Sequence, residues 1–216
     1  MQYITSGDFN KSYPFSEEDF NTDFETYLSS LAPSHKANGS IIQKPEWKVG
    51  DQWTYAVKHP GDKPLTTMTV VREDKFEGKE SYVVRMENRE IFHSKESLEP
   101  LIAMKDGKLT SKRYTSSHEF SWPLIIGKRW NNAYAWEDLA TKDKRKIDHL
   151  MVVSEIGDVT VPAGTFLAAR VQAFDSRSGR LMWEYWYSPT TKWLLKFRDY
   201  SKIAFKEERL SSFKID

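Results

Sequence analysis

Short runs of β-branched and aromatic residues alternate with Gly, Pro, Asp and Ser from Pro45 to the end of the chain. This pattern predicts strands separated by tight turns. Helical crossovers are missing between the strands, so we expect consecutive antiparallel hairpins rather than parallel pairs. The expected strands are Asp51–Lys58, Thr66–Lys75, Ser81–Asn88, Leu98–Lys105, Lys108–Ser116, Lys128–Trp136, Lys146–Ile156, Gly164–Phe174, Leu181–Ser188, Trp193–Tyr200 and Ile203–Ser211.

The first part of the chain has a helical pattern instead. Ser16 is an expected N-cap, and Phe15 with Phe20 matches a hydrophobic staple. One apolar face follows at helical spacing. Its members are Phe20, Phe24, Tyr27, Leu28 and Leu31. Because Pro33 disfavours helix at the residue before it, we expect a helix over Ser16–Leu31. This helix either packs on the main domain, or it is a detachable plug or a helix that binds a protein partner.

Two turn sequences specify hairpins. Asp106-Gly107 lies between two strand runs and suits a tight turn in which Gly takes a positive φ. In Val161-Pro162-Ala163-Gly164, Pro sets φ at the first turn position, and Gly can adopt the left-handed conformation of a bulge. These features favour a meander of neighbouring strands.

Aromatic residues are concentrated on strands where they alternate with other residues. In Trp183-Glu184-Tyr185-Trp186-Tyr187 the odd positions face one side of the sheet, and Trp186 faces the other. Trp193, Leu195 and Phe197 repeat this alternation on the next strand. We expect the inward set to line any apolar ligand site. Its candidate residues are Trp122, Trp130, Trp183, Tyr185, Trp193, Leu195 and Phe197.

The expected fold is therefore mainly β: a strongly curved antiparallel sheet, forming a half-barrel or open barrel of ~10–11 strands, with one N-terminal α-helix. We expect a helical segment and linker over 1–44 and a β domain over 45–216. A weak internal sequence similarity divides the β domain into two similar meanders, 45–121 and 122–216. The aromatic side chains can fill the core, line a cavity for an acyl chain, or form an exposed surface for a protein or glycan.

Composition narrows the function classes. The chain has 216 residues, of which 14% are aromatic, and it includes eight Trp. A net charge of +1 argues against a nucleic-acid-binding protein, which usually carries a clear basic excess. No apolar run approaches the ~18–20 residues of a transmembrane helix. The oligomeric state is left open by the sequence.

The sequence contains no recognisable motif of a catalytic or metal site. The chain has no Cys, so thiolate chemistry, disulfides and Cys-ligated zinc are excluded. Its five His show no metal-site spacing, and no GxSxG or phosphate-binding glycine loop occurs. We therefore expect no enzyme, no metal and no cofactor. A hydrolase with a carboxylate or His site in the concave mouth stays an alternative, and it predicts converging polar groups with shifted pKa values.

Three segments together resemble a known family. They are Pro45-Glu46-Trp47-Lys48-Val49-Gly50-Asp51-Gln52-Trp53-Thr54-Tyr55, Val161-Pro162-Ala163-Gly164-Thr165-Phe166, and Trp186-Tyr187-Ser188-Pro189 followed by Lys196. In this order the chain from Pro45 onward is similar to the TapB-like group of exported bacterial proteins of unknown function, which are often lipoproteins. The resemblance implies a half-barrel around a helix or a cavity, similar to the lipoprotein carriers LolA and LolB. The family has no described catalytic residues that could be carried over to positions in this chain.

This resemblance implies a periplasmic or cell-surface location in a bacterium. The segment from Met1 to Asn10 has neither a basic start nor an apolar stretch, so it does not match a signal peptide, and we expect any export signal or lipobox upstream of it. The first functional hypothesis is a non-enzymatic envelope protein that holds a hydrophobic ligand in its concave face or acts as an accessory subunit. The second is an interaction module of a larger surface or secretion assembly, docked through the helix Ser16–Leu31.

Overall fold

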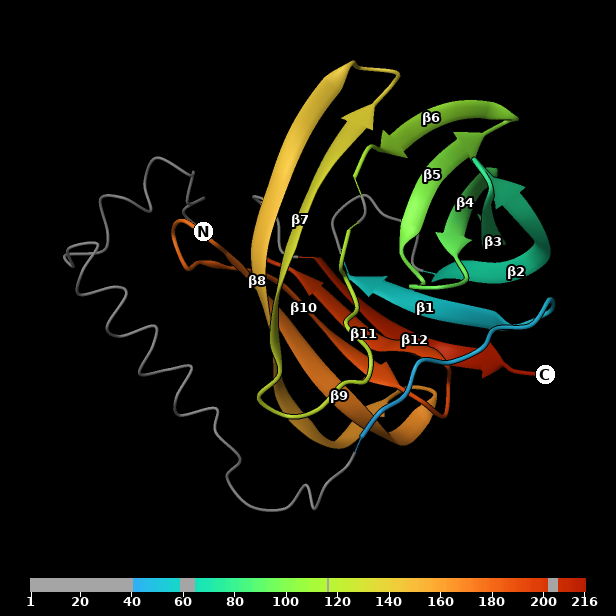
Figure 1. The fold of residues 1–216 in the computed structure, drawn as a ribbon. Coiled ribbons are helices and arrows are strands. Elements are labelled where there is room, and N and C mark those ends of the chain that lie inside the picture. Colours follow the sequence, from blue (N-terminus) through green and yellow to red (C-terminus); the bar gives the residue numbers. More distant parts are fainter. Residues whose placement is uncertain (1–40, 59–64, 116, 202–205) are drawn as a thin grey trace.

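The computed structural model describes residues 41–58, 65–115, 117–201 and 206–216, which form an all-β closed barrel (Figure 1). Its strands are β1 (Gln52–Lys58), β2 (Leu65–Phe76), β3 (Lys79–Met86), β4 (Arg89–Ser94), β5 (Pro100–Lys105), β6 (Lys108–Arg113), β7 (Arg129–Asp138), β8 (Asp143–Val161), β9 (Gly164–Asp175), β10 (Leu181–Ser188), β11 (Trp193–Asp199) and β12 (Lys206–Lys214). No helix in these ranges is long and apolar enough to cross a membrane.

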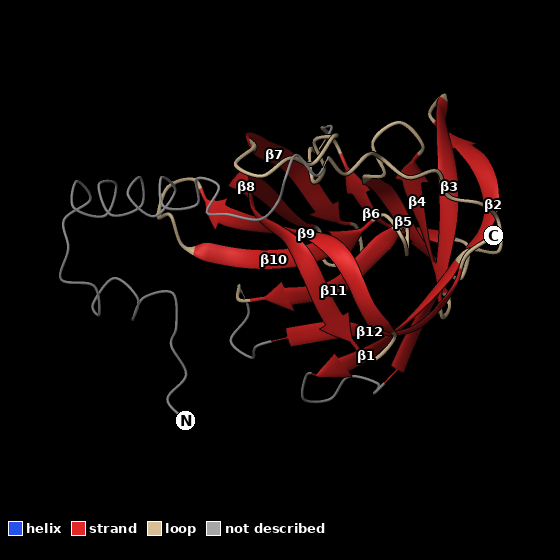
Figure 2. Cartoon of the chain, turned by 90° about the horizontal axis from the view of Figure 1, so that it is seen from below, coloured by secondary structure: helices blue, strands red, loops and turns tan. Residues whose placement is uncertain are grey.

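Each strand pairs antiparallel with its neighbours in sequence, as the hairpin pattern predicts. The sheet then closes because β1 pairs with both β2 and the last strand, β12. At this seam Gln52 lies opposite Lys214 and Lys58 lies opposite Glu207. Figure 2 shows β1 and β12 side by side in the lower part of the barrel. The expectation of a half-barrel or open barrel is therefore wrong: the sheet is closed, and it has twelve strands.

The strand that the sequence analysis missed is β4. It follows a turn in which Glu87 has a φ of +57°, so a non-glycine residue takes the conformation that usually marks glycine. Its first residues, Arg89 and Glu90, are charged, and Glu90 forms ion pairs with Arg85 on the adjacent strand β3 and with Arg72 on β2. Neither a turn glycine nor an apolar run therefore marks where β4 begins.

The two predicted turns have the expected positive φ values. Asp106 and Gly107 have φ values of +50° and +75°, which is the pair of positive values that a two-residue type I′ hairpin needs. Gly164 has a φ of +135° at the start of β9. A side chain at this glycine would also approach the ring of Phe166 to within 3.1 Å, so glycine is required here for two reasons.

Alternation along the strands separates two hydrophobic clusters in the β2–β5 region. Tyr82 and Val84 of β3 belong to the main core, whereas Val83 between them packs with Phe92 and Ile102 in a smaller cluster. Both faces of this region are therefore covered by apolar contacts. Figure 1 shows the strong curl of β2 to β6 that accompanies this two-sided packing.

Both ends of the described chain are fastened near the seam by one buried carboxylate. Asp51 is fully buried, and its side chain accepts hydrogen bonds from the backbone N–H groups of Lys48 and Asp216, each at 3.0 Å. The ammonium group of Lys192 lies 3.2 Å from the same carboxylate. Asp51 therefore joins the start of β1, the β10–β11 hairpin and the C-terminus.

The predicted helix Ser16–Leu31 lies outside the described residues. The division into 1–44 and 45–216, with two similar meanders, stays a prediction. Within the described part of the first segment, Ile42 is buried and pairs with Leu124 through two backbone hydrogen bonds.

We predict that Trp53→Ala lowers the free energy of unfolding by about 3–5 kcal/mol, because it removes a fully buried ring and leaves a cavity. It also removes the hydrogen bond from the indole N–H to the carbonyl of Thr191. Urea unfolding followed by circular dichroism measures the change. Leu109→Ala is the control, since Leu109 is 39% exposed and its loss should cost less than about 0.5 kcal/mol. Equal losses in the two variants would contradict a tightly packed interior.

Candidate functional site

A cluster of aromatic rings occupies the barrel interior, with Trp47 at its centre. The Trp47 ring centroid lies 5.4 Å from that of Trp53, 5.4 Å from Tyr82 and 4.8 Å from Trp193. These distances are those of rings in direct contact in tilted and edge-to-face arrangements. The indole N–H groups of Trp47 and Trp53 donate to the carbonyls of Lys192 and Thr191. The polar edges of the rings are therefore satisfied by the β10–β11 hairpin.

The structure brings all seven predicted ligand-lining residues into this one hydrophobic cluster. Tyr185, Trp193 and Leu195 are buried members of it. The other four are only partly buried and pack against it, namely Trp122, Trp130, Trp183 and Phe197. The predicted set therefore divides into residues that fill the core and residues that keep part of their surface accessible. Whether any of them contacts a ligand stays a prediction.

Strand register places two of the half-buried rings in one row across the sheet. Trp130 pairs with Met151, Met151 pairs with Ala173, and Ala173 pairs with Trp183. Met151 and Ala173 are fully buried between the two Trp-bearing strands. The Trp183 ring also stacks on Tyr185 with centroids 5.7 Å apart, so half-buried and buried rings form a continuous surface.

The sequence analysis did not select several rings at the centre of the cluster. Trp47, Trp53, Tyr82 and His93 are all buried there, and His93 lies edge-on to Trp47 with centroids 5.3 Å apart. Trp47 and Trp53 lie in the segment Pro45–Tyr55, on which the family resemblance is partly based. That segment was the sequence signal that could have identified them as core residues. No sequence signal marked His93 as a core residue, because the strand β4 was not identified.

The connection between β6 and β7 lies across the interior face of the barrel. This crossing segment comprises residues 114–128, of which 116 is outside the description. Its Phe120 ring contacts the rings of Tyr185 and Trp193, with centroids 5.3 and 5.6 Å apart. The Tyr185 hydroxyl donates to the carbonyl of Glu119 at 2.8 Å, and the Trp130 N–H donates to that of His118 at 2.5 Å. Side chains on the barrel wall therefore hold the segment in place.

The crossing segment also brings ionisable groups together at its start. Arg113 donates to the Ser117 hydroxyl at 2.6 Å and to the Glu119 carboxylate at 3.0 Å. Burial, with a further contribution from the charge of Glu119, raises the pKa of Glu99 to about 7. Burial lowers the pKa of His93 to about 4. At neutral pH the interior therefore contains a neutral histidine and a carboxyl group that is close to half protonated.

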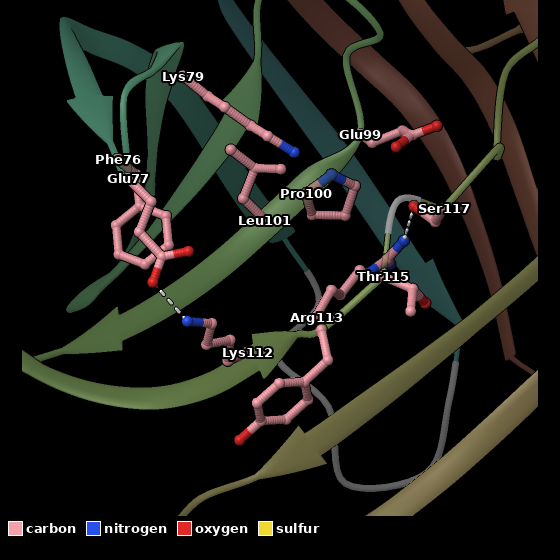
Figure 3. A pocket seen from close by; sticks show the side chains of 11 residues that line it. Phe76, Glu77, Lys79, Glu99, Pro100, Leu101, Lys112, Arg113, Thr115 and Ser117 are labelled. Atoms are coloured by element: carbon pink, nitrogen blue, oxygen red, sulfur yellow. Dashed lines mark hydrogen bonds and ion pairs between the residues drawn. The ribbon is translucent and has the colours of Figure 1, made fainter.

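Figure 3 shows a pocket of about 210 Å³ beside this group of residues. It lies between the β2–β3 turn, the start of β5 and the end of β6. Its lining residues are Phe76, Glu77, Lys79, Glu99, Pro100, Leu101, Lys112, Arg113, Tyr114, Thr115 and Ser117. We call it the β5–β6 pocket. The sequence analysis selected none of these residues, because they come from separate turns and strands with no shared motif.

Several buried polar atoms have no hydrogen-bond partner among the described residues. They are His93 Nε2, Glu99 Oε1, Trp122 Nε1, Asn132 Nδ2, His149 Nδ1 and the Tyr187 hydroxyl. Buried polar atoms are normally paired, so atoms of this kind mark places where a water molecule or a ligand group completes the structure. Glu99 is the one that lines the β5–β6 pocket.

A second group of charged side chains lies on the face of β10 opposite to Trp183 and Tyr185. Glu184 is fully buried and accepts hydrogen bonds from Arg170 at 2.6 Å and from the Tyr200 hydroxyl at 2.7 Å. The cations of Arg170, Lys196 and Arg198 lie over the ring of Trp186 at 4.6–5.4 Å. These groups pair with one another, as expected for an arrangement that stabilises the sheet.

No family model matches the chain, and no curated protein matches it. The solved structures to which the chain is similar include a candidate lipoprotein of Parabacteroides distasonis, at 11% identity and a TM-score of 0.42, covering 81% of this chain and 100% of that one. A candidate exported protein of Bacteroides fragilis with a YmcC-like fold has 13% identity and the same score and coverage.

The hypothetical lipoprotein YmcC of Escherichia coli has 10% identity and a TM-score of 0.42, covering 94% of this chain and 98% of that one. At these scores the likeness does not decide a function.

The raised pKa of Glu99 predicts a specific dependence of stability on pH. A carboxyl group with a folded-state pKa of about 7 stabilises the fold at acidic pH, and this contribution is lost as the pH rises through 7. We therefore expect that the free energy of unfolding of Glu99→Gln, relative to that of the parent protein, rises by about 1–3 kcal/mol between pH 5 and pH 8.

Urea unfolding at the two pH values tests this expectation. Glu96→Gln on the same β4–β5 turn is the matched control, because Glu96 is exposed. Its stability relative to the parent should be the same at both pH values. A constant difference for Glu99→Gln would contradict the raised pKa.

Proposed function

We propose that this protein is a non-enzymatic binding protein that holds an apolar ligand against half-buried rings of its barrel interior. One observation carries the proposal. Trp122, Trp130, Trp183 and Phe197 pack on the buried aromatic cluster and still keep accessible surface. An apolar ligand that covers such surface gains roughly 25 cal/mol per Å².

The half-buried rings are better candidates for ligand contact than the fully buried ones. Trp47, Trp53 and Trp193 are held by contacts with one another, so a ligand among them would have to displace a ring. By contrast, Trp130 and Trp183 lie in one row of the sheet, on either side of Met151 and Ala173. A ligand on the accessible surface of these two rings would leave the contacts among Trp47, Trp53 and Trp193 intact.

We further propose a bacterial envelope location. This part of the proposal rests on the resemblance of three sequence segments to exported proteins, of which the segment from Pro45 to Tyr55 is the longest. The docking helix Ser16–Leu31 lies outside the described residues, and its role as a partner-binding element stays a prediction.

A hydrolase is the second candidate, and one observation favours it. The carboxyl group of Glu99 has a pKa of about 7 and lines a pocket, as expected of a general acid or base. However, the nearest hydroxyl of the crossing segment, that of Ser117, accepts a hydrogen bond from Arg113, and the nearest imidazole, that of His118, is largely exposed. Without an activated nucleophile beside Glu99, binding is the simpler function.

The proposal predicts that Trp183→Ala and Phe197→Ala each weaken binding of an apolar fluorophore such as N-phenyl-1-naphthylamine about tenfold. Each change removes apolar contact area worth more than 1 kcal/mol. Fluorescence titration measures the affinity, and native mass spectrometry of protein from its original host identifies any lipid that copurifies.

Leu109→Ala, on the exposed outer side of β6, is the matched control and should bind the fluorophore as the parent does. The absence of fluorophore binding by the parent, or equal binding by all three variants, would refute an apolar site at these rings.

A further inference from the structure

Four cations gather on the outer face of β9–β12, which lie side by side in the barrel wall (Figure 2). Strand register places three of them in one row around Trp186. Trp186 lies opposite both Arg170 and Lys196, and Lys196 lies opposite Arg209. The fourth cation, Arg198, follows Lys196 two positions along β11 and therefore points to the same side of the sheet. We call these four residues the cationic patch.

The carboxylates of this region lie beneath the cations. Among the described residues, two carboxylates form ion pairs with the patch, and of these Glu184 is fully buried and Glu207 is 3% exposed. Arg170 and Arg198 donate to Glu184, while Arg198 and Arg209 donate to Glu207. The side chains of the three arginines are still 29–51% exposed. Solvent therefore meets guanidinium groups at this face rather than their carboxylate partners.

The patch has a surplus of positive charge even when a carboxylate at its rim is included. Glu155 of β8 is exposed and lies opposite Arg170 in the strand register. With Glu155, four cations share three carboxylates. Burial, together with the neighbouring charge of Arg198, lowers the pKa of Lys196, as expected where like charges are crowded. An anionic partner at this face would reduce the repulsion among the cations.

The chain itself contains a segment of opposite charge. Residues 17–25 contain five carboxylates and neither Lys nor Arg, the acidic residues being Glu17, Glu18, Asp19, Asp23 and Glu25. We call this segment the acidic stretch. The fifteen residues 26–40 separate it from Ile41, where the described part of the chain begins. Fifteen extended residues span up to ~50 Å, about three times the ~17 Å radius of gyration of a folded chain of this length, so the acidic stretch can reach the patch.

We propose that the acidic stretch binds the cationic patch of the same chain. A guanidinium group has five N–H donors, so the three arginines can donate to further carboxylates without releasing Glu184 and Glu207. Each exposed ion pair contributes little by itself, and the attraction depends on several pairs acting together. Salt weakens such an attraction by screening. Bound in this way, the acidic stretch lies on the outer wall of the barrel, away from the half-buried rings of the proposed ligand site.

Spin labelling of the full chain tests the proposal. Because the chain has no Cys, Thr22→Cys carries a nitroxide at a single position within the acidic stretch. At low salt we expect the nitroxide to remove more than half of the intensity of the amide signals of Lys196 and Arg209. The signals of Ala103 and Ser111, on β5 and β6 across the barrel, should keep their intensity. Adding 0.5 M NaCl should restore most of the lost intensity, since it shortens the range of the attraction.

Variants assign the attraction to the charges. Arg209→Gln should restore the signal of Lys196 in part, because one of the four cations is lost. Lys144→Gln removes the same charge from β8 outside the patch, where the side chain is 71% exposed, and should leave the broadening unchanged. Replacing all five carboxylates by amides should abolish the broadening; this variant is E17Q/E18Q/D19N/D23N/E25Q.

Three results would overturn the proposal. The first is equal signal loss, or none, at the patch and across the barrel. The second is broadening that persists in the five-amide variant, which would mean that apolar side chains hold the segment. The third is broadening in a mixture of spin-labelled chains with isotope-labelled chains that carry no nitroxide, which would place the acidic stretch on a second copy. Equal melting temperatures show that the variants fold, and fluorophore binding at the half-buried rings reports separately on the proposed function.

Discussion

Closure of the sheet between β1 and β12 is the constraint on which the rest of this structure depends. A closed barrel has no free strand edge, but it encloses an interior that must be filled. Aromatic rings meet this need because each buries ~150–250 Å² and packs edge to face with its neighbours. Trp47 lies just before β1, Trp53 lies on β1, and Trp193 lies on β11. The two sides of the seam therefore meet both in the strand pairing and in the core.

The crossing segment explains how polar groups come to lie inside an apolar barrel. It follows the inner face of the sheet, and its backbone carbonyls accept hydrogen bonds from Tyr185 and Trp130. Burying a lone carboxylate is costly, so Glu99 retains its proton to a higher pH than an exposed glutamate. Burial and the nearby charge of Glu119 therefore produce a group that titrates close to neutral pH. The apolar rings and this polar pocket are two distinct surfaces of one architecture.

Local signals in the sequence predicted most of the strands and the hydrophobic faces. The turn at Asp106-Gly107 was identifiable because few residues other than glycine tolerate its φ values. The inward direction of Trp183, Tyr185 and Leu195 followed from the two-residue period of a strand: Tyr185 and Leu195 are buried in the main core, and Trp183 packs against it. The strand β4 was missed because its preceding turn uses Glu87 rather than glycine, and closure was missed because no local pattern tells a half-barrel from a barrel.

The sequence by itself determined the antiparallel strand content, the principal hairpins and the inward-facing rings of β10 and β11, since each depends on residues a few positions apart. Only the tertiary structure decided the pairing of β1 with β12, the path of residues 114–128 across the interior and the grouping of Glu99 with Lys79 and Arg113. These features join residues that are far apart in the chain. Their energies depend on burial and on charge–charge distance, and neither quantity exists until the barrel has closed.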